Sequence, residues 1–440
     1  MYKYREIWHI AYPILISLVM QTIINITDTA YMGRVGEVEL GATALASVYY
    51  MAIYMAVFGF SIGAQVLIGR RNGEGRYDRI GGIVLQGVIF LLVIAALLIL
   101  LSMWLSPLLL SSIVTSPRIF EKCMDYHDWR IWGLLFSAVN VMGRAFYVGI
   151  TRTKVLIWNS VIMTCANVVF NYILVFGTWG IPAMGIAGAA LGSVLSEALA
   201  SLHFFLYTVC HVDTARYGLR GRLHFVPSIV KSILSLSVWT MLQNFLTHAV
   251  WFVFFLGIEH LGELPLAITN IVRSGSSLLF MPILAFAATS STLVSNALGA
   301  GRADDVLTVI RRVIGMNYAV TAPILILIAL FPSLLLMIFT NNMELIEASM
   351  TSLYVMLGFN LLAIPGCVLF HSVSGTGNTR FALFIEIIAT LLYALMIYII
   401  IFYWRADVAW CWSVEYVYWG VMLVCTSLYF KYANWRERKV

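Results

Sequence analysis

The feature that most constrains this chain is a series of long, nearly uncharged apolar stretches. Each is close to the roughly 20 residues that an α-helix needs to cross a bilayer. They are too long and too evenly apolar for the strands of a transmembrane β-barrel, which are about ten residues long and alternate. Twelve stretches run near 8–32, 43–68, 80–104, 127–148, 155–176, 185–209, 228–256, 264–291, 307–331, 350–374, 381–403 and 408–431. Lipid provides no hydrogen-bond partner for an unpaired backbone N–H or C=O group, so each stretch must form a helix. The sequence therefore predicts an all-α integral membrane protein with twelve transmembrane helices.

The composition excludes several other classes of protein. Hydrophobic residues make up 61% of the 440 residues and charged residues 11%, against roughly 25% charged residues in soluble domains. A soluble enzyme, a disordered chain and a nucleic-acid-binding domain are therefore excluded. The six cysteines are scattered singly without a CxxC pair, so we expect no disulfide framework, no metal site and no cofactor.

The basic residues predict the orientation in the membrane. Of the 27 Lys and Arg residues, 20 lie in the set of alternate loops that includes both termini. The opposite loops hold Arg34, Arg118, Lys122, Arg130 and Arg405. Since cytoplasmic loops carry the excess of Lys and Arg, both termini are expected in the cytoplasm. We expect a multi-pass protein of a bacterial or archaeal cytoplasmic (inner) membrane.

Two pairs of loops repeat at one constant offset in the numbering, 226. Gly73-Glu74-Gly75-Arg76-Tyr77-Asp78 matches Gly299-Ala300-Gly301-Arg302-Ala303-Asp304, and Gly149, Thr153 and Lys154 match Gly375, Thr379 and Arg380. An offset of six helices keeps the orientation, so the repeat is parallel. We expect six-helix lobes at 1–210 and 228–440, joined by a polar cytoplasmic linker at 211–227, with a substrate pathway at the interface of the halves.

Polar side chains line one face of the first stretch. Ser17, Gln21, Asn25 and Asp28 are spaced by 4, 4 and 3 residues, which places them on one side of a helix. A charged group at mid-membrane costs roughly 2.5–3.5 kcal/mol on insertion scales. Asp28 is therefore interpreted as a protonatable or cation-binding carboxylate that faces a cavity. The alternative is a structural Asp paired with a basic or amide group.

Other polar groups lie within the apolar stretches. Asn167 and Asn171, one helical turn apart, either line a pathway or tie helices together. For Glu197, Glu386 and similar residues an interhelical bond is the preferred interpretation. Arg144 lies near the end of its stretch, so its side chain can extend to the cytoplasmic surface.

The segment from Tyr12-Pro13 to Gly33-Arg34-Val35-Gly36, the twelve helices, the parallel halves and the paired glycine loops resemble the multidrug and toxic compound extrusion (MATE) family. The resemblance covers nearly the whole chain. It implies a MATE/MOP-type fold and a secondary active antiporter that exports organic, cationic and amphipathic compounds by alternating access. It also implies a small-molecule substrate, and we expect a monomer.

Within that family the chain is most similar to the DinF-type branch. This resemblance implies coupling to protons through Gln21, Asp28, Tyr126 and Asn167. Asn25, on the same face as Asp28, joins this set, as does Asn171, which stands where relatives have Asp. The NorM-like branch has acids in its seventh and tenth helices for sodium, whereas 228–256 and 350–374 contain none. We therefore expect protons rather than sodium.

The second half is expected to differ in chemistry. The residue 226 positions after Asp28 is Phe254, so this half is predicted to bind the apolar part of substrates. The candidates for substrate binding are Arg144, Phe252, Phe254, Phe255 and Met281. The alternatives are a sodium-coupled antiporter and a lipid or lipid-linked oligosaccharide flippase, which Arg144 and Arg273 would suit. An intramembrane enzyme is not expected, since His127-Asp128 is the only adjacent His–Asp pair.

Overall fold

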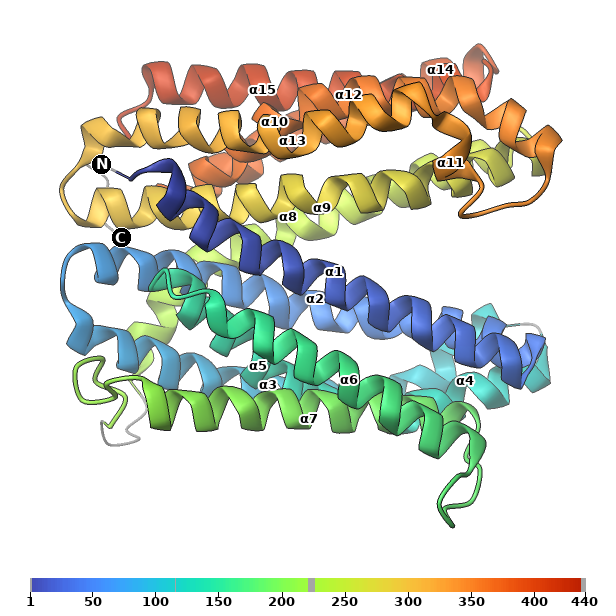
Figure 1. The fold of residues 1–440 in the computed structure, drawn as a ribbon, viewed down its shortest axis with the longest axis horizontal. Helices are drawn as coiled ribbons and strands as arrows, with labels where there is room; N and C mark the ends of the chain where they lie inside the picture. The colour runs from blue at the N-terminus through green and yellow to red at the C-terminus, as the bar shows by residue number, and fades with distance from the viewer. Residues whose placement is uncertain (1, 115, 221–225, 437–440) are drawn as a thin grey trace. The chain divides into compact units, whose positions relative to one another are not determined.

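The computed structural model describes residues 2–114, 116–220 and 226–436, and these residues form helices without any strand. The long helices are α1 Tyr4–Val35, α2 Glu37–Gly73, α3 Ile80–Ile113, α4 Pro117–Arg130, α5 Gly133–Gly149, α6 Lys154–Phe176, α7 Ile186–His211, α8 Pro227–Glu259, α9 Glu263–Gly299, α10 Val306–Leu330, α12 Met343–Gly375, α13 Thr379–Ile397 and α15 Val414–Tyr432 (Figure 1). Short helices are η1 Tyr77–Arg79, η2 Ala303–Asp305, α11 Pro332–Leu336, η3 Tyr398–Tyr403 and α14 Val408–Trp412.

The number of spans agrees with the sequence. Eleven helices of the described residues are long and apolar enough to cross a membrane, and α4 with α5, bent by 51° at a short break, makes up to 12. The prediction of a twelve-helix membrane protein is confirmed. The expected fourth stretch, 127–148, begins in the last turn of α4 and continues through the bend into α5.

The internal repeat is visible in the helix boundaries. Helices α2 and α9 begin and end at the same offset as the loops, and so do η1 and η2. The segment 117–149 of α4 and α5 corresponds to 343–375 of α12. Gly75 and Gly301 have φ angles of +72° and +70° at the matched turns, a conformation that glycine adopts without steric cost. The parallel repeat predicted from the loops is therefore confirmed.

The chain divides into two compact units. The first unit contains residues 16–237, and the second contains residues 1–15 and 238–440. The division passes through α1 and α8. The lobe limits at 210 and 228 and the linker 211–227 stay a prediction. Residues 221–225 of that linker lie outside the described residues, as do the basic residues Arg222, Arg438 and Lys439.

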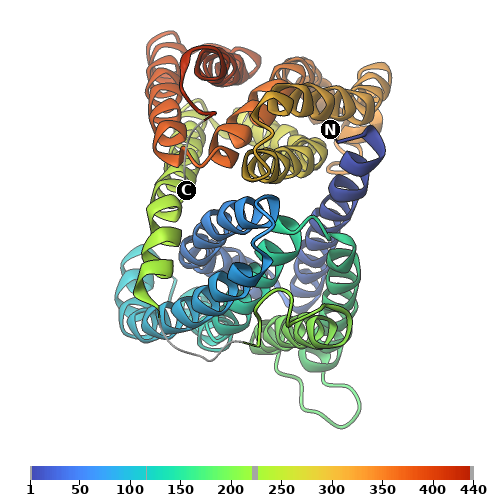
Figure 2. The ribbon, with the colours of Figure 1, turned by 90° about the vertical axis from the view of Figure 1, so that its left-hand side faces the viewer.

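Close packing within each unit follows from small and branched side chains. In the first unit, a side chain at Gly188 would meet the backbone of Leu174, so α6 and α7 approach closely there. In the second unit, Ile283 and Ala287 of α9 pack against Ala363 and Ile364 of α12. Figure 2, which looks along most of the helices, shows α9 beside α12. Small residues permit such contacts between membrane helices.

Candidate functional site

Asp28, Asn171 and Asn167 form a hydrogen-bonded chain in the first unit. Asn171 Nδ2 donates to Asp28 Oδ1 over 2.6 Å and to Asn167 Oδ1 over 3.4 Å. Asn167 Nδ2 donates in turn to the Ser193 hydroxyl over 3.2 Å. Both asparagines are fully buried, whereas Asp28 is half-buried. The chain of bonds links α1, α6 and α7, so these three helices hold the carboxyl group in place.

A glycine makes room for this arrangement. Gly192 of α7 lies against Asn171, and a Cβ atom at position 192 would overlap Asn171 Oδ1. The amide can turn its nitrogen toward Asp28 only because this space is open. Sequence reasoning found the asparagines by their spacing, but it did not find Ser193 or Gly192. Their positions inside an apolar stretch were the only signal.

Asp28 is held by the Asn171 amide rather than by a cation. Among the described residues it makes no ion pair, although its carboxylate lies within electrostatic range of Arg130 and Glu197. The Asn171 amide donates to one carboxylate oxygen without neutralising the charge of Asp28. Such a carboxylate can take up a proton or bind a cation.

A buried ion pair lies beside this cluster. Arg130 Nη2 and Nη1 donate to Glu197 Oε1 and Oε2 over 2.6 and 3.2 Å. The Ser137 hydroxyl donates to Glu197 Oε2 over 3.1 Å, and the Arg130 guanidinium lies 3.8 Å from the centre of the Tyr50 ring. The prediction that Arg130 lies in an outer loop is wrong, because it ends α4 inside the bent α4–α5 span. Its side chain is only 13% exposed, because Glu197 draws it into the bundle at the bend between α4 and α5.

The remaining residues predicted for coupling form no hydrogen bond to Asp28. Gln21 and Asn25 are exposed on α1 and make no hydrogen bond to Asp28. Tyr126 is buried in an apolar cluster with Met32 and Cys123, within electrostatic range of Asp28 but without a hydrogen bond to it. The structure thus brings together Asp28, Asn167 and Asn171 directly.

The substrate-binding candidates of the second unit differ in their exposure. In the second unit, Phe254 is fully buried, whereas Phe252 is 65% exposed. Phe255 and Met281 are half-buried, and the Arg273 guanidinium lies 5.3 Å from the Phe255 ring centre.

Arg144 belongs to the first unit. Its guanidinium lies 5.7 Å from the Phe58 ring centre, and its Nε has no hydrogen-bond partner among the described residues. The side chain is half-buried, and its role in substrate binding stays a prediction.

The second unit carries aromatic rings where the first carries the polar cluster. At the repeat offset, Phe254 corresponds to Asp28 and Tyr393 to Asn167, and the two ring centres are 6.2 Å apart. The Tyr393 hydroxyl donates to the buried Glu415 over 2.8 Å, an acid that sequence reasoning missed. The two units therefore share a fold but not the chemistry at this position.

Glu386 makes the interhelical bonds that were expected of it. Its Oε1 accepts from Thr247 of α8 over 2.7 Å and from Tyr418 of α15 over 2.8 Å. In the described residues no three His, Cys, Asp or Glu side chains converge in a way that would hold a metal ion.

The sequence is similar to known transporters. A model of the MatE family matches residues 13–173 and again residues 240–399, so each half carries one match. Three curated relatives are called "Probable multidrug resistance protein NorM". Those of Shewanella oneidensis and Synechocystis sp. are 25% and 26% identical over 69% and 67% of this chain. The matches span just under two thirds of those relatives, 66% and 64%. The relative of Thermotoga maritima is 26% identical over 85% of this chain and 80% of its own length.

Solved structures show the same fold. An outward-facing multidrug resistance MATE family transporter of the MOP superfamily superimposes with a TM-score of 0.90 at 19% identity, over 97% of this chain and 95% of the other. A MOP superfamily transporter from Pyrococcus furiosus superimposes with a TM-score of 0.87 at 19% identity, over 98% of this chain and 94% of the other.

The relatives are named as resistance proteins and transporters, not enzymes, as expected. Assignment to the DinF-type branch stays a prediction, since the three curated relatives are named NorM. The two matches to the family model cover more than half of the sequence, and the chain belongs to the MatE family.

Proposed function

We propose that this protein is a secondary active efflux antiporter. It exports organic, cationic and amphipathic small molecules in exchange for protons, and it works as a monomer in the cytoplasmic (inner) membrane with both termini in the cytoplasm. The family membership and the names of the relatives support export of toxic compounds. The distribution of basic residues supports the orientation.

The Asp28–Asn171 contact is the observation that carries this proposal. A carboxylate accepts from Asn171 Nδ2 at 2.6 Å, and Asn171 Oδ1 is a buried acceptor without a partner among the described residues. An amide offers both a donor and an acceptor. It can therefore satisfy Asp28 in the ionised form and, by turning, in the protonated form.

Protonation of Asp28 changes what this site binds. The ionised carboxylate attracts a cationic substrate, and a proton removes that charge. The proton also weakens the charge-assisted bond between α1 and α6. A ligand shifts a conformational equilibrium by its differential affinity for the two states. Proton and substrate thus favour opposite states as the lobes 1–210 and 228–440 rock.

The exchange has a simple energetic consequence. If one proton enters for each monovalent cation that leaves, no net charge crosses the membrane. The pH gradient then drives transport with about 1.4 kcal/mol per pH unit.

The apolar part of the substrate is assigned to the second half. Phe252, Phe255 and Met281 are the proposed lining residues, and the buried Phe254 packs behind them. Arg144 is the proposed substrate-binding residue of the first half.

Sodium is the second candidate for the coupling ion. The Asp28 carboxylate and the buried, unpartnered Asn171 Oδ1 are hard oxygen ligands of the kind that alkali and alkaline-earth cations prefer. A turn of the Asn171 amide would direct both oxygens at one ion.

Efflux from proteoliposomes tests the proposal. Ethidium, a fluorescent organic cation, is loaded, and either a proton gradient in sodium-free buffer or a sodium gradient at equal pH is imposed. We expect efflux with the proton gradient and its loss in Asp28→Asn, while Glu347→Gln, an exposed carboxylate-to-amide change in α12, behaves as wild type. Efflux that needs sodium would overturn proton coupling. Full efflux by Asp28→Asn would overturn the role of Asp28.

A further inference from the structure

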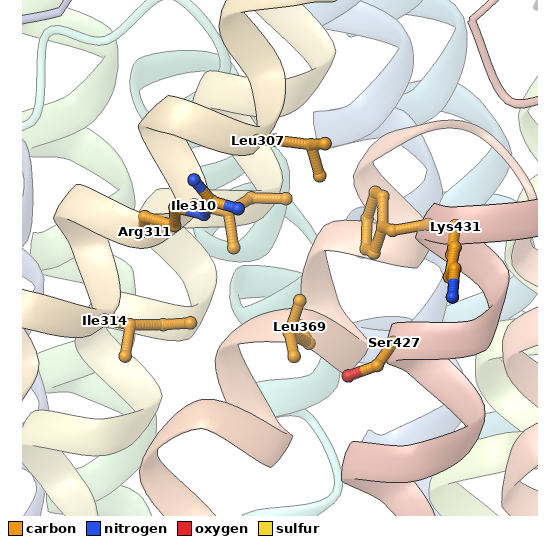
Figure 3. Close-up of a pocket in the computed structure, with 8 residues that line it drawn as sticks. Leu307, Ile310, Arg311, Ile314, Leu369, Ser427 and Lys431 are labelled. Atoms are coloured by element: carbon orange, nitrogen blue, oxygen red, sulfur yellow. The ribbon is translucent and has the colours of Figure 1, made fainter.

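The second unit contains an open cavity of about 400 Å³ between α10, α12 and α15. None of its lining residues is assigned to transport above. They are Leu307, Ile310, Arg311, Ile314, Leu369, Ser427, Phe430 and Lys431 (Figure 3).

The lining combines an apolar floor with two cations. Figure 3 shows Arg311 of α10 and Lys431 of α15 on opposite sides, with Leu369 of α12 between them. Both basic side chains are exposed, and neither forms an ion pair with a carboxylate among the described residues. The Lys431 ammonium lies 5.1 Å from the Tyr432 ring centre. A ligand that fits this lining has an anionic group and a hydrocarbon chain.

The cavity lies where α10 begins and α12 and α15 end. The Thr376 and Tyr429 hydroxyls share a hydrogen bond of 2.9 Å there, and Arg436 pairs with Asp304 over 3.1 Å. The excess of basic residues assigns this end to the cytoplasmic surface. Anionic phospholipids give the cytoplasmic leaflet its negative potential, and basic pockets between helices on that side bind their headgroups.

The first unit provides an internal comparison. The residues 226 positions before Arg311 and Lys431 are Leu85 and Phe205, which are apolar. The counterpart of Leu369 is Gly143, and a Cβ atom there would lie 2.9 Å from the ring of Phe204. The shared fold therefore does not require cations at these two positions, and they distinguish this groove from the matching surface of the first unit.

We propose that this groove binds one anionic phospholipid of the cytoplasmic leaflet. The lipid phosphate lies between Arg311 and Lys431, and an acyl chain follows Ile310, Ile314 and Leu369 toward the membrane interior. The Arg311 stem is long enough to bring its guanidinium to the headgroup level. The proposal depends on the proposed orientation but not on the transported substrate or the coupling ion.

Native mass spectrometry of the full chain in detergent tests the proposal. Dioleoylphosphatidylglycerol and dioleoylphosphatidylcholine are titrated separately. Because a basic residue near a lipid surface changes affinity about fivefold, we expect Arg311→Gln/Lys431→Gln to bind phosphatidylglycerol roughly thirtyfold more weakly. Its weak phosphatidylcholine binding should not change. The matched pair Arg79→Gln/Lys154→Gln, exposed basic residues of the first unit, should bind both lipids as wild type.

Two further variants separate a groove from a charged surface. Leu369→Trp keeps both cations but fills the floor, and it should lose phosphatidylglycerol binding. The swap Arg311→Lys/Lys431→Arg should keep that binding, which shows that the fold survives change at these positions. Unchanged binding by the double Gln variant or by Leu369→Trp would overturn the proposal. So would displacement of the lipid by inorganic phosphate, which would identify a phosphate site without a lipid. These lipid-binding measurements do not depend on transport. A failure of this proposal can therefore be distinguished from a failure of the proposed antiport.

Discussion

The Arg130–Glu197 pair allows a prediction that separates ion pairing from packing. Substitution of Glu197 by Gln keeps the shape of the side chain but removes its charge. The Arg130 guanidinium then stays buried at the bend between α4 and α5 without a counterion, because its side chain is only 13% exposed. We expect Glu197→Gln to destabilise the protein markedly.

The magnitude follows from the contacts. Removal of one partner of a buried ion pair typically costs about 3–5 kcal/mol. The amide oxygen of Gln can still accept one of the two guanidinium bonds, which now measure 2.6 and 3.2 Å. The Tyr50 ring, 3.8 Å away, adds a cation–π attraction of up to about 2 kcal/mol in a desolvated site. The expected loss is therefore near the lower end of that range, about 3 kcal/mol.

Reversible unfolding of the purified protein in mixed micelles measures this loss. The double variant Arg130→Met/Glu197→Leu is the decisive comparison, since an apolar replacement of a buried pair is often neutral or stabilising. We expect its free energy of unfolding to exceed that of Glu197→Gln by about 2 kcal/mol or more, by the same principle. A Glu197→Gln variant within about 0.5 kcal/mol of wild type, or a double variant as unstable as the single one, would refute the reasoning.

Four other substitutions test three of the contacts described here. Gly192→Ala should displace Asn171 from Asp28 and abolish ethidium efflux while the protein still inserts; normal efflux would show that this amide is not needed. Phe254→Ala should cost about 3–5 kcal/mol in unfolding experiments because it leaves a cavity, whereas Phe252→Ala should stay within about 0.5 kcal/mol; equal losses would contradict their assigned burial. Tyr393→Phe removes the hydroxyl that donates to the buried Glu415 carboxyl, so it should lower the free energy of unfolding by about 1–3 kcal/mol. An unchanged unfolding curve would argue against the Tyr393–Glu415 bond.

The sequence by itself determined the spans and the repeat. Hydrocarbon forces every backbone group into internal bonds, so a long apolar run has a single outcome, a helix. The turns at Gly75 and Gly301 could be matched because glycine is favoured where φ is positive. The faces of α1 and α6 that carry Asp28, Asn167 and Asn171 could also be predicted, since helical periodicity is a local property.

The contacts between helices were decided only in the tertiary structure. Asp28 and Asn171 are 143 residues apart, and Arg130 and Glu197 are 67 apart. The local sequence does not determine which polar side chains contact one another between helices. Their meeting depends on how closely helices approach, as at Gly192, and on which side chains fill the space between them. Arg130 seemed to belong to a loop for this reason, and Phe254, matched in sequence to Asp28, proved to be a core residue. A buried charge is positioned by its partner, and the partner is chosen by packing between helices rather than by sequence distance.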